Sequence, residues 1–315
     1  LNTAKGQAMQ KEKSTDEAAV GRQEGPTDEN SRRDFLRKGS LGIAGVAGAA
    51  ALNVQTSEAV AQESSSGKKR VVILFDSWNH MMPALAREMV RRNHDLVLGD
   101  ARDKELVEEL RQLGAKVEVV PGTEDQTKPE TFQKLVDRAR EAFGGFDSAC
   151  IRTGTHVNAS VLTAKREDLD TVVEGNLKTV FDALRAVLPP LVEQGSGQVV
   201  INTSAGAVRP QPEVALYCAT RAAANALIHA TALEVASKGV TLNATGTYGM
   251  AYPSFLHMVG ADKDPAKAKA VGDAMPIKRL IQPEDAASFV ATLIDGTATG
   301  MTAQFFPIDG GWSFM

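Results

Sequence analysis

The sequence predicts an α/β fold, a doubly wound parallel sheet with helices on both faces, in a single domain. Two observations support this prediction. Short apolar segments alternate along the chain with longer segments whose apolar residues recur at helical spacing. The short segments are apolar at most positions, as expected for strands that are buried on both faces. Strands that alternate with helices are joined by right-handed crossovers, so the sheet is parallel.

Each element has its own signal in the sequence. Apolar runs predict strands at 70–75 (RVVILF), 94–100 (HDLVLGD), 115–121 (AKVEVVP), 146–152 (FDSACIR), 197–204 (GQVVINTS), 239–246 (GVTLNATG) and 302–311 (TAQFFPIDGG). Helical periodicity predicts helices at 81–93, 103–113, 129–144, 166–193, 213–237 and 283–296. About seven strands in this order form a Rossmann architecture, in which ligands bind beyond the carboxyl ends of the strands.

The composition excludes several classes of function. The chain has 315 residues, 43% of them hydrophobic, and a formal net charge of −4. This balance fits a soluble α/β protein and argues against nucleic acid as the main partner. Cys150 and Cys218 lie far apart without a CxxC pair, and the five histidines show no metal-ligand spacing. No metal site is therefore predicted, and a disulfide between the two cysteines is the less favoured alternative to free thiols.

The first 69 residues differ in character from the rest. Residues 1–30 are polar and are predicted to be disordered. Residues 31–61 contain the pair Arg32 and Arg33, an apolar run and a final Ala-Val-Ala, and they resemble a twin-arginine (Tat) export signal. The alternative is a basic amphipathic helix.

The resemblance to a Tat signal has consequences for the whole protein. It implies that the export machinery carries the folded protein to the periplasm or the exterior. It also implies cleavage near Gln62, followed by a linker over 62–69 and the domain over 70–315. The apolar run is too short for a stable membrane span.

One set of residues suggests a catalytic site. Tyr217 and Arg221 are four apart on a predicted helix, so they share one face. Ser204 lies thirteen residues before Tyr217 at the end of a strand, and Asn176 lies in EGNLKTVF. Together with NTSAGAV, YCATRAA, FGGFDSACIRTG, RLIQPEDAA and PIDGGW, these residues make the segment 70–315 similar to the short-chain dehydrogenase/reductase family.

The resemblance implies hydride transfer between NAD or NADP and a small carbonyl or alcohol. Tyr217 would give or take the proton, Ser204 would bind the substrate oxygen, and Asn176 would anchor a water-linked proton relay. The family has a lysine where this chain has Arg221. A guanidinium can also lower the pKa of the tyrosine, but it is planar and longer than a lysine ammonium, so the exchange is not conservative.

The phosphate-binding glycines of the family are missing. The pattern Thr-Gly-x-x-x-Gly-x-Gly falls on 75–82, which places its glycines at Asp76, His80 and Met82. Glycine lets the backbone approach the pyrophosphate, whereas an aspartate brings a negative charge to it. Two other cofactor positions are closer to the family: Gly154 is retained after the fourth strand, and Asp100 would bind the adenosine ribose and favour NAD. The alternative for Asp100 is a turn or helix-capping aspartate.

The topology predicts what fills the changed groove. The first and fourth strands are neighbours in this fold, so Asp76 and Arg152 should form an ion pair. Trp78 and Met82 should fill part of the phosphate groove. His80 and His156 should lie on the same rim, as a proton relay, a metal site or, more simply, solvent-facing loop residues.

Three functions remain open from the sequence. The first is an exported NAD(P)-dependent oxidoreductase, the second a catalytically inactive descendant that binds a ligand or partner, and the third a cofactor-independent enzyme that uses Tyr217, Ser204 and the histidines. The segment 247–279 should form the substrate loop, and its apolar residues suit a hydrophobic small molecule or an oligomer contact. By resemblance to the family, the alanine-rich helix after Tyr217 implies a homodimer or homotetramer.

Overall fold

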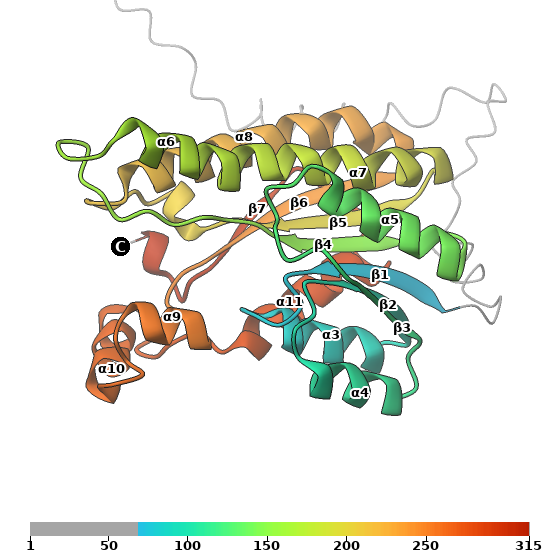
Figure 1. Cartoon of the computed structure of the whole chain (residues 1–315), viewed down its shortest axis with the longest axis horizontal. Helices are drawn as coiled ribbons and strands as arrows, with labels where there is room; N and C mark the ends of the chain where they lie inside the picture. Colours follow the sequence, from blue (N-terminus) through green and yellow to red (C-terminus); the bar gives the residue numbers. More distant parts are fainter. Residues whose placement is uncertain (1–68, 315) are drawn as a thin grey trace, which may run out of the picture. The chain divides into compact units, whose positions relative to one another are not determined.

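The computed structural model describes residues 69–314 and contains the predicted parallel sheet (Figure 1). The sheet has the strand order β3-β2-β1-β4-β5-β6-β7, and every neighbouring pair is parallel. The strands are β1 (Arg70–Phe75), β2 (His94–Gly99), β3 (Val117–Val120), β4 (Ser148–Arg152), β5 (Gly197–Asn202), β6 (Val240–Thr247) and β7 (Phe305–Ile308). The order reverses at β1 and β4, which places a binding crevice beyond their carboxyl ends.

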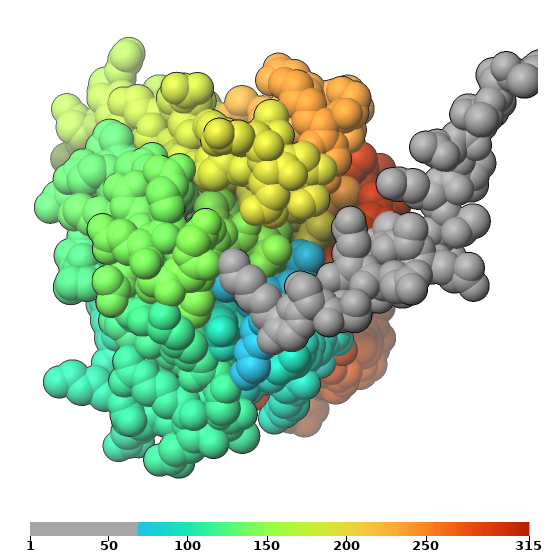
Figure 2. All heavy atoms as spheres, turned by 90° about the vertical axis from the view of Figure 1, so that its right-hand side faces the viewer, coloured from blue at the N-terminus to red at the C-terminus, as the bar shows by residue number. Residues whose placement is uncertain are grey.

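Two layers of helices cover the sheet (Figure 1). One layer contains α5 (Glu130–Phe143), α6 (Arg166–Val173), α7 (Thr179–Gln194) and α8 (Ala215–Val235), and the other contains α3 (Met82–Arg91), α4 (Lys104–Gln112) and α11 (Pro283–Ile294). Successive residues of β1 point to opposite layers: Ile73 belongs to the first hydrophobic core and Leu74 to the second. In Figure 2, the blue of the first described residues, which include β1, shows over a small area between the green and yellow parts of the chain.

The structure departs from the prediction in two segments. The helix expected at 166–193 is interrupted by a π-helical turn, Glu174–Lys178, between α6 and α7. The substrate segment 247–279 is not a plain loop, because it contains α9 (Pro253–Met258) and α10 (Pro265–Ala274). Short 3₁₀ turns, Ala205–Ala207, Ala236–Lys238 and Trp312–Phe314, complete the elements.

The structure also shows the state of the two cysteines and the length and polarity of the helices. Cys150 and Cys218 are both buried and free. Within residues 69–314, no helix is long and apolar enough to cross a membrane. The expected disordered region, Tat signal and cleavage site lie outside the described residues.

The prediction for Met82 was wrong. Met82 does not fill the phosphate groove, because it begins α3 and its side chain is fully buried in the same hydrophobic core as Leu74 and Leu85. The methionine therefore occupies space between helix and sheet that a glycine would leave for closer packing.

Met82→Ala should lower the free energy of unfolding by about 2–4 kcal/mol, because it leaves a cavity in a close-packed core. Urea unfolding followed by circular dichroism measures the change. Leu113→Ala, at a side chain that is 53% exposed, is the control and should change stability by less than about 0.5 kcal/mol. Equal effects of the two substitutions would contradict the placement of Met82 in the core.

Candidate active site

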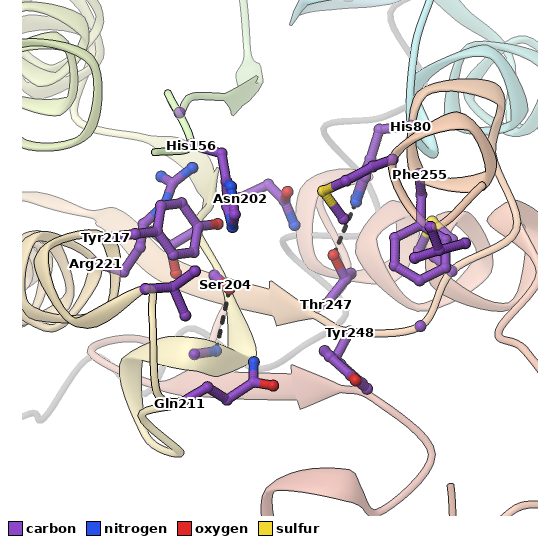
Figure 3. A pocket seen from close by; sticks show the side chains of 18 of the residues that line it. His80, His156, Asn202, Ser204, Gln211, Tyr217, Arg221, Thr247, Tyr248 and Phe255 are labelled. Carbon is purple, nitrogen blue, oxygen red and sulfur yellow. Dashed lines mark hydrogen bonds between the residues drawn. The ribbon is translucent and has the colours of Figure 1, made fainter. Parts of the chain in front are cut away.

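A hollow of the described chain lies beyond the carboxyl ends of the central strands (Figure 3). This catalytic cavity has a volume of about 380 Å³. Figure 3 shows Tyr217, Arg221 and His156 on one wall, with His80 and Phe255 on the opposite wall. The other lining residues used below are Arg152, Thr153, Gly154, Asn158, Ser204, Gln211, Thr247, Tyr248, Met250, Tyr252 and Met258.

Tyr217 and Ser204 meet in this cavity. Tyr217 lies in the first turn of α8, and Ser204 caps the 3₁₀ turn that follows β5, where its Oγ accepts a hydrogen bond of 3.0 Å from the Gly206 amide. Burial raises the pKa of Tyr217, but the Arg221 charge, hydrogen bonding from Ser204 and the Arg152 charge together outweigh burial. The pKa of Tyr217 is therefore below its ordinary value of 10.0, as proton transfer at this hydroxyl requires.

Arg221 is fixed by the loop that follows β4. Its side chain is buried, Nη1 donates to Thr153 Oγ1 at 3.1 Å, and Nη2 donates to the Thr153 carbonyl. The guanidinium lies 5.2 Å from the centre of the Tyr217 ring. A Cβ at Gly154 would lie 1.5 Å from Arg221 Nη2, and the φ of +143° at this residue also favours glycine. The retained Gly154 thus leaves the room that the arginine occupies.

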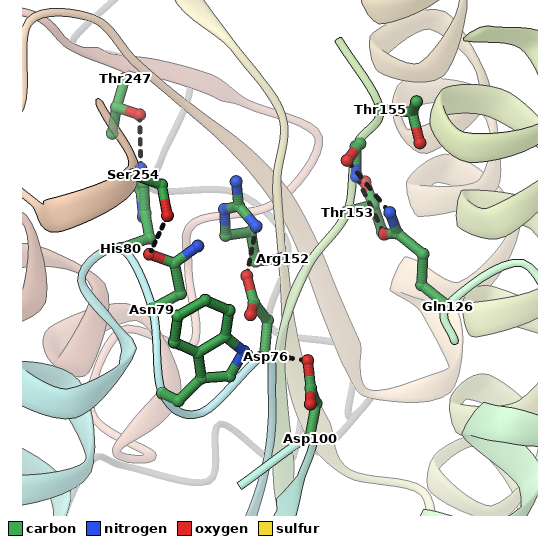
Figure 4. Close-up of polar contacts among 12 residues, drawn as sticks. Asp76, Asn79, His80, Asp100, Gln126, Arg152, Thr153, Thr155, Thr247 and Ser254 are labelled. Carbon is green, nitrogen blue, oxygen red and sulfur yellow. Dashed lines mark hydrogen bonds and ion pairs between the residues drawn. The ribbon is translucent and has the colours of Figure 1, made fainter. Parts of the chain in front are cut away.

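A second contact to Gly154 could not be predicted from the sequence. Gln126 Nε2 donates to the Gly154 carbonyl at 3.0 Å, and Gln126 Oε1 accepts from the Gly154 amide at 3.0 Å (Figure 4). Gln126 follows β3, so this pair of bonds joins the β4 loop to the loop after β3. A glutamine in a polar loop has no local pattern that would mark it as part of a site.

Asn176 lies in the π-helical turn and is fully buried. Its Nδ2 donates to the Thr155 carbonyl and to Thr220 Oγ1, both at 3.0 Å, and its Oδ1 accepts from the Thr155 amide at 2.9 Å. The side chain therefore joins the β4 loop to α8, and it does not line the catalytic cavity. In this structure Asn176 holds the loop beside Tyr217 in place.

The predicted ion pair of Asp76 and Arg152 is confirmed, with Arg152 Nη1 bound to Asp76 Oδ2 (Figure 4). Nearby, Asp100 does not present a free carboxylate to a ribose. It accepts hydrogen bonds from Arg102 at 2.6 and 3.0 Å and from Trp78 Nε1 at 3.0 Å. Trp78 thus lies at the end of β2, and the Cζ atom of the Arg102 guanidinium lies over its ring, 4.6 Å from the ring centre.

The two histidines have different surroundings. His80 is buried, which corrects the simpler expectation of a solvent-facing residue, and its Nε2 lies 2.8 Å from Thr247 Oγ1. Burial, together with the charges of Arg152 and Arg221, holds the pKa of His80 well below 6.5. His156 is exposed, and its ring centre lies 4.6 Å from that of Tyr217.

The phosphate half of the crevice does not fit a dinucleotide bound on a glycine loop. A second, smaller hollow of about 150 Å³ is lined by Asp76, Asp100 and Arg102, among others. Arg152 lines both hollows, and its ion pair with Asp76 lies between them. A dinucleotide would have to pass this ion pair and bring its phosphates beside the Asp76 carboxylate.

Comparisons with known proteins agree with the architecture. A family model described as enoyl-(acyl carrier protein) reductase matches residues 83–313. The chain is 31% identical over 188 residues to the 4-formylbenzenesulfonate dehydrogenase of Comamonas testosteroni, which covers 59% of this chain and 75% of that one. It is 27% identical over 247 residues to the 2,5-dichloro-2,5-cyclohexadiene-1,4-diol dehydrogenase of Sphingobium indicum, covering 78% of this chain and 96% of that one.

Solved structures are similar as well. The crystal structure of levodione reductase has a TM-score of 0.70 and 26% identity, and the match covers 78% of this chain and 98% of that chain. The structure of ElxO with NADP bound has a TM-score of 0.69 over 78% of this chain and all of that chain. Its identity is 17%, so it supports the fold alone.

The three tyrosines of the chain should ionise separately, because the pKa of Tyr217 is lowered whereas burial raises the pKa values of Tyr248 and Tyr252. A titration followed by tyrosinate absorbance should show one early transition, which Tyr217→Phe removes. Arg221→Met should move that transition to higher pH. Arg102→Met, which removes a cation outside this wall, should leave it unchanged. An early transition that survives in Tyr217→Phe would contradict the assignment.

Buried His80 should make the protein less stable in acid. Its pKa is lowered in the folded state. Below pH 6.5 the imidazole is therefore protonated in the unfolded chain but stays neutral in the folded chain. This contribution to stability is present above pH 6.5 and is lost as the pH falls below it. His80→Asn, which tolerates the left-handed backbone, should reduce the slope of unfolding free energy by about 1.4 kcal/mol per pH unit. The exposed His257→Asn is the control, and equal slopes in the parent and His80→Asn would refute the prediction.

Proposed function

The chain belongs to the short-chain dehydrogenase/reductase family, and on this premise we propose that it is an oxidoreductase acting on a small carbonyl compound or alcohol. The observation that supports this proposal best is the wall formed by Tyr217, Ser204 and Arg221. It places a tyrosine of lowered pKa, a hydroxyl and a fixed cation side by side in one cavity.

The residues of this wall can move a proton at a substrate oxygen. In the direction of reduction, Tyr217 donates its proton to the carbonyl oxygen as that oxygen becomes an alkoxide, and the Ser204 hydroxyl holds the same oxygen by a hydrogen bond. The positive charge of Arg221 stabilises the phenolate that remains. In the direction of oxidation, the same phenolate accepts the proton of the alcohol.

Family membership implies NAD or NADP as the hydride carrier. Asp100 at the end of β2 favours NAD, whereas Arg102 beside it offers a cation to the extra phosphate of NADP. Since the ion pair of Asp76 and Arg152 lies in the phosphate half, use of either nucleotide is part of the proposal, and both must be tested.

The cavity suits a small substrate with an apolar part. Met250, Tyr252, Phe255 and Met258 supply apolar surface from α9 and from the connection between β6 and α9. Asn158 and Gln211, in the loops that follow β4 and β5, supply polar groups. The relatives named above are dehydrogenases of small ring compounds, by their names. A substrate of that size, with its carbonyl or hydroxyl at Tyr217, is consistent with a volume of about 380 Å³.

A second candidate is a ligand-binding protein that has lost the redox reaction. The ion pair of Asp76 and Arg152 across the phosphate groove favours it, because this pair blocks the path of a dinucleotide. In that case the catalytic cavity still binds a small molecule, but the lowered pKa of Tyr217 serves no turnover.

Export and assembly complete the proposal. The twin-arginine pattern at 32–33 supports export of the folded protein to the periplasm or the exterior through the Tat machinery. A homodimer or homotetramer through the α7–α8 layer is supported by two large apolar side chains exposed there, Phe181 at 51% and Leu233 at 71%.

Calorimetric titration of the full chain with NADH and with NADPH separates the two candidates. An oxidoreductase should bind at least one nucleotide and should reduce members of a panel of small aldehydes and ketones. Tyr217→Phe should bind that nucleotide equally well and lose about 10²–10⁴-fold in turnover. Tyr248→Phe removes the hydroxyl of a second tyrosine that lines the cavity but stacks on Trp312, and as the matched control it should keep most of the activity.

The absence of nucleotide binding would refute the oxidoreductase proposal. If neither nucleotide binds at millimolar concentration, and no nucleotide is released when the untreated protein is denatured, the oxidoreductase proposal fails. The ligand-binding candidate then stands.

A further inference from the structure

The loop that replaces the phosphate-binding glycines keeps a left-handed backbone. Asp76 and His80 stand at the first two glycine positions, and their φ angles are +65° and +58°. This region favours glycine, although aspartate and histidine enter it more readily than most other residues. The loop has therefore gained side chains at positions whose backbone still has a conformation that suits glycine.

Each of these side chains has a partner across the crevice. His80 reaches Thr247 at the end of β6, with 2.8 Å between Nε2 and Oγ1, and Asp76 reaches Arg152 at the end of β4. Phe75 and Ile151 are register partners in β1 and β4, so Asp76 and Arg152 each follow directly on a paired residue. The sheet itself therefore brings the two charges together.

Asp76 is the only acidic ion-pair partner of Arg152 among the described residues. Both side chains are largely buried, at 9% and 23% exposure. A buried guanidinium needs an anion beside it, and guanidinium groups bind phosphate as readily as carboxylate. The pair lies between the catalytic cavity and the smaller hollow, and Asp76 stands at the first glycine position after β1, where this fold binds phosphates.

We propose that the Asp76 carboxylate stands in for a dinucleotide phosphate on Arg152, so that Asp76 lowers the affinity of the crevice for NAD(P) and Arg152 becomes a phosphate ligand once that carboxylate is removed. The inference rests on the proposed function in taking the nucleotide to be NAD or NADP. It assigns to Arg152 a role that glycine-loop amides do not share, because an arginine side chain supplies both charge and paired N–H donors.

The test compares four variants of the full chain by calorimetric titration with NADH and NADPH. Asp76→Asn removes the charge, keeps the size and tolerates a left-handed backbone. Asp76→Gly also removes the bulk and relieves the backbone. Asp76→Asn combined with Arg152→Met removes both partners. Asp137→Asn, on the exposed side of α5, changes the net charge equally far from the crevice and is the control.

Both single variants at Asp76 should bind at least one nucleotide tenfold or more tighter than the parent, since a negative charge next to the phosphates is removed. The double variant should lose this gain, and Asp137→Asn should match the parent. Thermal unfolding of each variant verifies that it is folded, and Asp76→Asn keeps the test valid if the glycine variant is unstable.

The other possible results distinguish failure of this inference from failure of the oxidoreductase proposal. If the parent binds a nucleotide and the Asp76 variants bind it no tighter, the inference is wrong and the oxidoreductase proposal stands. If the Asp76 variants bind and the parent does not, the inference holds and the oxidoreductase proposal fails for the natural chain. If no folded variant binds either nucleotide, both are wrong. A gain that persists in the double variant would overturn the role of Arg152.

Discussion

The parallel register of β4 with its two neighbours is the constraint on which the site depends. In this register Ile151 pairs with Phe75 of β1, and Arg152 pairs with Asn202 of β5. A slip by one residue would turn every side chain of β4 to the opposite face, which two buried cores forbid. The position of Arg152, between the two hollows and beside Asp76, is thus fixed by backbone hydrogen bonds and core packing rather than by the charges themselves.

The architecture and one long-range contact could be predicted from the sequence. Strand and helix periodicities are local, so alternating apolar runs suffice to predict a parallel sheet of seven strands. The pairing of Asp76 with Arg152 needs one further step, the rule that places the first and fourth strands side by side. Both residues directly follow strands, and the carboxyl ends of parallel strands share one edge of the sheet.

The contacts that the sequence could not predict depend on packing in three dimensions. Met82 can be assigned to the core only when the packing of α3 against the sheet is known. The burial of His80 depends in the same way on its contact with Thr247 at the end of β6. The two bonds of Gln126 to Gly154 join loops that are 28 residues apart and carry no periodic pattern. Side-chain type and position therefore marked Met82 and His80 as candidates and left their partners undetermined, whereas Gln126 was not marked at all.

The left-handed backbone at Asp76 and His80 also bears on how this lineage can change. Aspartate and glycine codons differ by a single base, and glycine at position 76 would meet a main chain that already has the conformation it favours. At Asp76 and His80 the loop thus carries side chains on a main chain whose conformation suits glycine. The loop remains within one mutational step of a glycine at this position, so its present chemistry is evolutionarily reversible.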